Sequence, residues 1–325
     1  MEPIRRVYDL NGFTLGVAAG DEQLSSFLDP ILAPLACLPS SVCDWVVALS
    51  PVPVIDAAVE GRRIFEGPLP EGLPCVMVEE SGLRRLVTPG HFAVSFRRDA
   101  RRTDVAFVPG AEQHIGGTAA YWILDDVLAA HDQFLLHGGL VVDPVNDCSI
   151  AIFAPSGTGK TTTVLALARS GFCCAGDDAL VLDVSQDACG MWAVPRQLKV
   201  HRKTAALLPW LDPLLTGTWT DDEQAIEINS LQSVVQCASP RRRRVELVIV
   251  LKSPNPHDHA VTSITKPEAL MLIACDNLRV APGGVDADNA RSLAALGALV
   301  ARTPVVALSV GPDPASLTCD LIGRV

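Results

Sequence analysis

The sequence predicts an α/β fold for the second half of the chain, preceded by a region that is mostly β. Three observations lead to this prediction. Short apolar runs broken by Gly and Pro fill residues 1–110. From about residue 135, strand-like runs alternate with segments of helical periodicity. A glycine-rich loop, "APSGTGKTTT" at 154–163, follows an apolar run and opens a helical one, an order that is typical of α/β proteins.

The N-terminal 110 residues contain four runs typical of strands: "DWVVALSPVPVID", "PCVMVEE", "HFAVSFRRD" and "DVAFVPG". Gly and Pro residues, which favour turns, separate these runs. We therefore expect a mostly β region with helical pieces. After it, residues 117–134 carry apolar side chains at helical spacing and predict a helix. We draw the domain boundary here, with residues 1–115 as the divergent β-rich region and 116–325 as the second domain.

The second domain shows a clear order of elements. "LLHGGLVVD" predicts a strand, "PVND" a turn, and "CSIAIFA" a second strand. The loop follows, then a helix over Lys160–Ser170 that Gly171 ends. "FCCAGDDALVLD" predicts a strand, a turn and a strand. Later segments predict two strands and two helices, namely "RVELVIVL", "PVVALSV", "KPEALMLIAC" and "ADNARSLAALGALVAR".

Charge and composition exclude several classes of function. The net charge of −11 argues against a protein that coats nucleic acid. No apolar run reaches the roughly 18 residues that span a bilayer, and "MEPIRRVYDLNGF" lacks the apolar core of a signal peptide. We therefore expect a cytoplasmic protein with no membrane or nucleic-acid partner. Without an export signal its ten cysteines are expected to be reduced and mostly in the core. No C-x-x-C pair occurs, so their spacing supports no zinc site.

The loop at 154–161 is expected to bind nucleotide phosphates. Such a loop needs backbone N–H groups that converge on the phosphates, a helix N-terminus facing them, a lysine that reaches the β/γ oxygens, and a hydroxyl that ligates Mg²⁺. The sequence has Ala154 where the usual pattern has glycine, which is tolerable if the φ angle of Ala154 is negative. The residues expected to contact the nucleotide are Ser156, Gly157, Thr158, Gly159, Lys160, Thr161 and Thr162.

Two further features favour phosphate transfer. Asp177 and Asp178 come 17 and 18 residues after Lys160, beside the strand of the loop. One carboxylate could hold Mg²⁺ and the other could face an acceptor hydroxyl, although a polar turn is the alternative. His137 lies one strand before the loop, where its own strand can lie beside the loop's strand. A strand-end histidine with no function is the alternative for this residue.

From about residue 135 to 183 the sequence resembles the catalytic core of the HPr serine kinase/phosphorylase family. The shared features are a His-Gly strand, a short P-loop, a helix and an Asp-Asp pair, in "LLHGGLVV" and "SIAIFAPSGTGKTTTVLALARSGFCCAGDDALVLD". The resemblance implies a P-loop kinase core with a mixed sheet and flanking helices. It also implies a site that binds ATP, or GTP, together with Mg²⁺.

Carried over residue by residue, the resemblance makes His137, Asp177 and Lys160 catalytic and gives Thr161 and Asp178 the metal. Residues 1–110 do not resemble the N-terminal domain of HPr kinases, and the glycine-rich signature that follows the core in that family is missing. The layout is most similar to the related kinases of lasso-peptide biosynthesis. This implies a peptide or protein partner with an acceptor serine, such as the C-terminal serine of a lasso-peptide precursor, and leaves a homo-oligomer open.

Alternatives remain at this point. The core could phosphorylate a small molecule, or it could belong to a nucleotide-gated regulatory ATPase that transfers no phosphate. Arg196, Lys199 and His201 could neutralise charge in the transition state or could be solvated surface. The run Arg241–Arg244 could guard a hydrophobic strand or clamp a phosphate or an acidic partner. The acidic stretch at 220–230 is expected to be an exposed loop.

Overall fold

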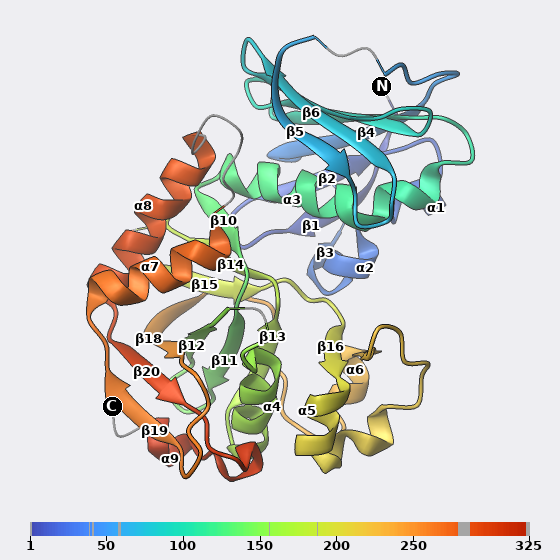
Figure 1. Ribbon diagram of the computed structural model, residues 1–325. Coiled ribbons are helices and arrows are strands. Elements are labelled where there is room, and N and C mark those ends of the chain that lie inside the picture. Colours follow the sequence, from blue (N-terminus) through green and yellow to red (C-terminus); the bar gives the residue numbers. More distant parts are fainter. Residues whose placement is uncertain are drawn as a thin grey trace. The chain divides into compact units, whose positions relative to one another are not determined.

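The computed structural model describes residues 2–38, 40, 42–57, 60–155, 157–186, 188–278 and 287–322. These residues fall into two compact units, the first ending at Asp132 and the second beginning at Gln133 (Figure 1). Both units combine large sheets with helices, so the predicted α/β class holds for the chain. The predicted helix near residue 120 belongs to the first unit, although we drew the start of the second domain at residue 116.

A nine-stranded sheet forms the first unit within the described residues, in the order β3-β1-β2-β4-β9-β8-β7-β6-β5. Strands β2, β4 and β9 are parallel neighbours, and the remaining pairs are antiparallel. The strands are β1 (Ile4–Asp9), β2 (Thr14–Ala18), β3 (Ala36–Cys37), β4 (Trp45–Pro51), β5 (Arg62–Pro68), β6 (Pro74–Glu80), β7 (Leu83–Thr88), β8 (Phe92–Arg97) and β9 (Arg102–Phe107). The helices are α1 (Glu22–Ser25), α2 (Asp29–Leu32) and α3 (Ala120–Ala129), with 3-10 turns at Ala33–Leu35 and Glu112–His114. The mostly β character predicted for this region is confirmed.

The predicted helix at 117–134 is too long at both ends. Residues Ile115–Ala119 form a π-type turn, with a kink at Gly117, and α3 begins only at Ala120. Asp132 has a left-handed backbone with φ of 57°, which no helix continues. The chain then extends as strand β10, from Gln133 to Leu136. The apolar spacing could not reveal this end because "FLL" fits a buried strand as well as a helix.

The second unit contains a mixed sheet in the order β10-β14-β15-β18-β12-β11-β13, with β20 beside β18 and β19 beside β20. Strand β12 runs parallel to β18 and antiparallel to β11. The strands are β10 (Gln133–Leu136), β11 (Gly139–Asp143), β12 (Cys148–Phe153), β13 (Cys173–Asp177), β14 (Leu180–Asp183), β15 (Gly190–Ala193), β18 (Arg243–Leu251), β19 (Ala260–Ser263) and β20 (Val305–Ser309). A separate pair joins β16 (Leu198–His201) to β17 (Glu223–Ile226).

Helices of the second unit include the three that were predicted. They are α4 (Lys160–Ser170), α5 (Arg202–Leu207), α6 (Ile228–Leu231), α7 (Lys266–Asn277), α8 (Ala287–Arg302) and α9 (Cys319–Ile322), with 3-10 turns at Pro209–Leu214 and Pro314–Ser316. Helix α4 has the predicted bounds, and Gly171 ends it with a positive φ of 129°. Helices α7 and α8 pack against each other, and α7 also contacts β18 (Figure 1).

Helix α4 belongs to a hydrophobic core of this unit. Its residues Val164, Leu165 and Leu167 are fully buried. The same cluster takes alternate residues of the central strands, such as Ile150 and Ile152, and residues from the segment that includes the β16–β17 pair. Burying an apolar side chain of this size stabilises a fold by about 1.5 to 3 kcal/mol relative to exposure. The position of α4 on the sheet is therefore firmly fixed.

The strand register brings three segments to one edge of the sheet. Gly139, the first residue of β11, is paired with Ile152 near the end of β12 and with Asp177 at the end of β13. The loop after β12, the residues just before β11 and the Asp177-Asp178 pair therefore lie at the same edge. This confirms that the strand following His137 lies beside the strand that leads into the loop.

Several sequence expectations need correction. The acidic stretch at 220–230 is not simply a loop, because it contains β17 and most of α6. The Arg241–Arg244 run is engaged within its own unit: Arg241 and Arg243 bind Asp147, Arg242 binds the buried Asp183, and Arg244 binds Glu246. These pairs satisfy the guanidinium groups within the fold and argue against a clamp for an external phosphate. The pairing anchors the start of β18 instead.

Cysteines are less uniformly buried than expected. Among the nine whose side chains are described, all are free thiols and four are buried: Cys75, Cys148, Cys174 and Cys189. Of the other five, three are partly exposed, and Cys37 and Cys275 are exposed. Within the described part of the chain, no helix combines the length and apolarity that crossing a bilayer requires.

Close approach of α4 to β11 gives a first testable prediction. A Cβ atom on Gly139 would clash with Cγ2 of Val164, so Gly139→Ala should destabilise the protein by about 1 to 3 kcal/mol through overpacking. A Cβ atom on Gly297, inside α8, would meet no other atom within 4 Å. The control Gly297→Ala should therefore stabilise the protein by roughly 0.5 to 1 kcal/mol. Urea unfolding measures both, and equal stability of Gly139→Ala and wild type would contradict the close approach.

Candidate functional site

The loop between β12 and α4 contains two glycines with left-handed backbones. Gly157 and Gly159 have left-handed φ angles of 78° and 99°, and a Cβ at either position would meet open space. Ala154 is buried and is not among the residues with positive φ, so an alanine fits where the usual pattern has glycine. Among the described residues no side chain caps the start of α4, so its first N–H groups have no side-chain partner there. Ser156 lies outside the described residues.

Lys160 is buried at the first position of α4, with 6% of its surface exposed. Its Nζ donates a hydrogen bond of 2.7 Å to the carbonyl oxygen of Ala154, so the lysine folds back along its own loop. Burial lowers the pKa of Lys160, and the charges of Asp276, Asp177 and Asp178 oppose this shift. The charges of three carboxylates therefore act on one buried ammonium group.

Thr161 and Asp177 are hydrogen-bonded to each other. Thr161 Oγ1 donates to Oδ2 of Asp177, whose side chain is almost fully buried. The other oxygen, Oδ1, is buried and has no hydrogen-bond partner among the described residues. Burial, assisted by the negative charge of Asp178, raises the pKa of Asp177 to about 6, while Thr161 and Lys160 act in the opposite direction. A carboxylate held in this way is poised to gain a positive partner.

His137 and Asp178 form the more open part of the site, each with about a third of its side chain exposed. His137 Nδ1 lies 3.3 Å from the carbonyl oxygen of Asp178 and 3.9 Å from its Oδ1. Asp178 has a left-handed backbone with φ of 69°, which Asp tolerates better than most residues. This turn separates its side chain from that of Asp177.

The contacts pair these residues differently from the sequence assignment. We expected Thr161 with Asp178 at a metal and His137 with Asp177 at the acceptor. In the structure Thr161 bonds Asp177, and His137 lies beside Asp178. Two adjacent residues at the end of a strand point in different directions, and the sequence does not show which one faces the helix. The structure resolves this because Asp177 is the last residue of β13 and Asp178 begins the turn.

Sequence reasoning missed two residues at the end of α7. Asp276 Oδ2 lies 3.8 Å from both Lys160 Nζ and His137 Nε2. Asn277 accepts a hydrogen bond of 2.6 Å from the backbone N–H of His137. The only signal in the sequence is that two polar residues, "DN", follow the apolar run "ALMLIAC". Nothing in that signal indicates a contact with a residue 140 positions earlier.

Other predicted residues are engaged elsewhere or lie nearby. The hydroxyl of Thr162 shares a 2.8 Å hydrogen bond with Thr204 in a buried position, so its side chain is directed at α5. The N–H of Thr158 donates to the carbonyl of Pro155 across the loop, at 3.2 Å. Lys199 pairs with Glu223 at 3.8 Å, and His201 caps α5 by accepting from the N–H of Lys203. These local roles favour surface structure over transition-state chemistry for both residues.

The donor set at this edge suits a hard cation. Among the described residues no group of three or more His, Cys, Asp or Glu side chains has the arrangement of a metal site. Hydroxyl and carboxylate oxygens are the ligands Mg²⁺ prefers, and it keeps several waters when a phosphate supplies the rest of its shell. Thr161 Oγ1 and the unpartnered Oδ1 of Asp177 offer such oxygens. The residues present therefore fit Mg²⁺ bound together with a phosphate.

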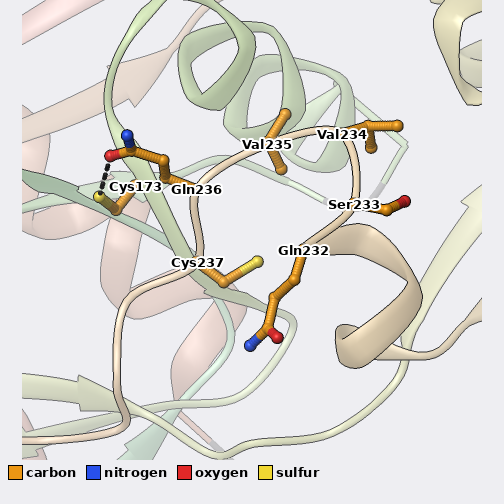
Figure 2. A pocket seen from close by; sticks show the side chains of 7 residues that line it. All are labelled: Cys173, Gln232, Ser233, Val234, Val235, Gln236 and Cys237. Carbon is orange, nitrogen blue, oxygen red and sulfur yellow. Dashed lines mark hydrogen bonds between the residues drawn. The ribbon is translucent and has the colours of Figure 1, made fainter.

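A separate shallow pocket lies at the other end of β13. Cys173, at the start of that strand, lines it together with the segment 232–237 (Figure 2). The thiol of Cys173 donates to Oε1 of Gln236 at 3.4 Å. Backbone hydrogen bonds between Cys174 and both Gln236 and Ala238 hold the segment along the edge of the sheet. The pocket contains none of the residues predicted to act on a nucleotide.

Comparisons with protein-family models and with curated proteins found no match.

The buried carboxylate predicts a pH-dependent stability. The pKa of Asp177 rises from 3.8 to about 6 on folding, so the unfolded chain releases its proton first and the native state loses stability as the pH rises through this range. Asp177→Asn keeps an acceptor for Thr161 and removes the penalty. Its gain in unfolding free energy over wild type should be larger at about pH 7.5 than at about pH 4.5, by on the order of 2 kcal/mol.

Chemical denaturation at the two pH values measures this difference. The control is Asp222→Asn, which removes a carboxylate that is 64% exposed and pairs with Arg202 at the surface. If Asp177→Asn gained the same unfolding free energy at both pH values, this would contradict the conclusion that burial disfavours the charged form of Asp177.

Proposed function

We propose that the second unit is an ATP-dependent kinase that transfers the γ-phosphate to a hydroxyl group, with a serine of a peptide or protein as the acceptor. The observation that carries this proposal is the convergence of Lys160, Thr161, Asp177, Asp178 and His137 at one sheet edge, around a glycine-rich loop. A loop with a lysine alone would support only nucleotide binding. The acidic pair and the histidine beside it supply what a transfer reaction needs.

Residues on α4 would hold the nucleotide. The left-handed glycines at 157 and 159 leave room for phosphate oxygens close to the backbone, and the start of α4 offers its uncapped N–H groups to them. Lys160 would move its ammonium group from the Ala154 carbonyl to the β/γ oxygens. Thr161 and Asp177 would hold Mg²⁺, which neutralises charge on the phosphates when it is bound. This gives Asp177 the metal role that we first assigned to Asp178.

The acceptor would lie on the side of Asp178 and His137, which are partly exposed. The hydroxyl oxygen attacks the γ-phosphorus, the bond from phosphorus to the β-bridging oxygen breaks, and ADP leaves. The hydroxyl proton passes to the carboxylate of Asp178, which accepts it as general base. His137 holds the Asp178 carboxylate and carbonyl in place through its Nδ1 side.

Two alternatives share the same residues. A small molecule could replace the peptide as acceptor, and a regulatory ATPase could use water instead of an acceptor. Mass spectrometry of a peptide and metabolite panel incubated with the protein, ATP and Mg²⁺ separates the three. A phosphopeptide supports the proposal, a phosphorylated metabolite supports the first alternative, and free phosphate alone supports the second.

Lys160→Ala tests the proposed nucleotide-binding part of the site. It should weaken ATP binding by more than about 100-fold and abolish phosphate transfer, because the buried ammonium group that would reach the phosphates is lost. Calorimetry with ATP and Mg²⁺ measures the affinity. Lys199→Ala is the control and should bind as wild type does, because this lysine is half-exposed and pairs with Glu223. Unchanged ATP affinity in Lys160→Ala would refute the site.

Asp178→Asn tests the proposed general base on the acceptor side of the site. It should lower the rate of transfer by about 100-fold or more while changing the affinity for ATP less than about threefold, since a lost general base affects the reaction more than binding. Asp177→Asn should instead weaken the dependence of ATP binding on Mg²⁺. The reverse pattern between these two variants would restore the assignment made from the sequence.

A further inference from the structure

The last turn of α7 contacts His137 with two neighbouring side chains, although α7 lies about 140 residues further along the chain. Oδ1 of Asn277 accepts a 2.6 Å hydrogen bond from the N–H of His137, and its Nδ2 lies 3.4 Å from the carbonyl oxygen of His137. The same Nδ2 donates to the carbonyl of Ile273 within the helix. The amide of Asn277 thus satisfies both backbone polar groups of His137, where β10 has ended and β11 has not begun.

Asp276 places one carboxylate oxygen between two nitrogen-bearing groups. Its Oδ2 is 3.8 Å from Lys160 Nζ and 3.8 Å from His137 Nε2, and it is buried with no hydrogen-bond partner within the described structure. A buried carboxylate oxygen without a hydrogen bond is costly, so a favourable charge interaction is needed to offset it. Lys160 supplies that interaction, and Asp276 is in turn the strongest of the negative charges that act on the buried lysine.

The groups that face Asp276 come from different elements. Lys160 is on α4, His137 precedes β11, and Asp178 follows β13 on the Nδ1 side of the same imidazole. The imidazole therefore lies between two acidic residues, one at each ring nitrogen. A single carboxylate that contacts both the lysine of the loop and the histidine of the acceptor side connects the two halves of the site.

We propose that Asp276 and Asn277 form a positioning clamp, with Asn277 fixing the backbone of His137 and Asp276 holding its ring and the Lys160 ammonium group. The transfer half of this inference rests on the proposed kinase function. Asp276 weakens the binding of an anion at Lys160, because its own negative charge lies next to the ammonium group. It also favours transfer by fixing the orientation of His137. The two effects of removing its charge should therefore have opposite signs.

Asp276→Asn tests the clamp because it keeps the size of the side chain and removes the charge. ATP should bind about threefold to tenfold more tightly, as the competing negative charge next to Lys160 is gone. Transfer of phosphate should slow by about tenfold to 100-fold, since the histidine is no longer held. Calorimetry measures the first effect and single-turnover kinetics the second. A residue with a merely structural role would weaken both.

Two variants serve as controls. Glu268→Gln removes an exposed acid from the first turn of the same helix, where it pairs with Lys252, and should change neither binding nor transfer. Asp276→Glu keeps the charge and should return the ATP affinity towards the wild-type value. Parallel weakening of ATP binding and transfer in Asp276→Asn, or no change in either, would overturn the proposal.

A readout on the free protein separates failure of the clamp from failure of the kinase proposal. In ¹⁵N spectra, the ring-nitrogen signals of His137 should change in Asp276→Asn and stay as in wild type in Glu268→Gln. If wild type binds ATP but phosphorylates no acceptor, the kinase proposal fails and the clamp is judged on ATP affinity and these signals. Unchanged His137 signals in Asp276→Asn would overturn the clamp whatever the enzyme assay shows.

Discussion

The double pairing of Gly139 is the constraint on which the rest of the candidate site depends. This residue is paired with Ile152 on one side and Asp177 on the other, and α4 approaches so closely that a methyl group would meet Val164. One register therefore fixes the end of β12, the start of β11 and the end of β13 together. A shift by one residue would turn every side chain of β11 to the opposite face. It would also separate His137 from Asp178.

Electrostatics explains why these residues need such precise support. One buried lysine lies among three carboxylates, and the most buried of them, Asp177, has its pKa raised to about 6. Several buried negative charges around one lysine destabilise the folded chain. A bound cation would reduce this cost, so the arrangement favours the cation-bound state over the free state. The large core around α4 supplies the stability that holds the charges in place. The first turn of α4 thus carries Lys160 and Thr161 of the site, and the turns that follow are buried in the core.

Much of this architecture could be predicted from residue patterns. The bounds of α4, the strands around the loop and the edge shared by His137 and the acidic pair follow from periodicity, glycine positions and the order of the elements. Three features could not be predicted. Two adjacent aspartates do not show which of them faces α4. The left-handed backbone of Asp132 prevents α3 from continuing to residue 134, although the apolar spacing alone would extend it. The contacts of Asp276 depend on where α7 packs. Each of these depends on tertiary geometry, which local patterns do not contain.

The contact between Asn277 and His137 also affects the order in which the site forms. Strands β11, β12 and β13 with α4 span fewer than 40 residues and can pair early, because closing a short loop loses little conformational entropy. The helix that completes the site is encoded about 90 residues beyond Asp177 and is synthesised later. Fraying of its last turn would release His137 while the sheet stays folded. Hydrogen exchange of the His137 amide therefore reports on the integrity of the site separately from that of the fold.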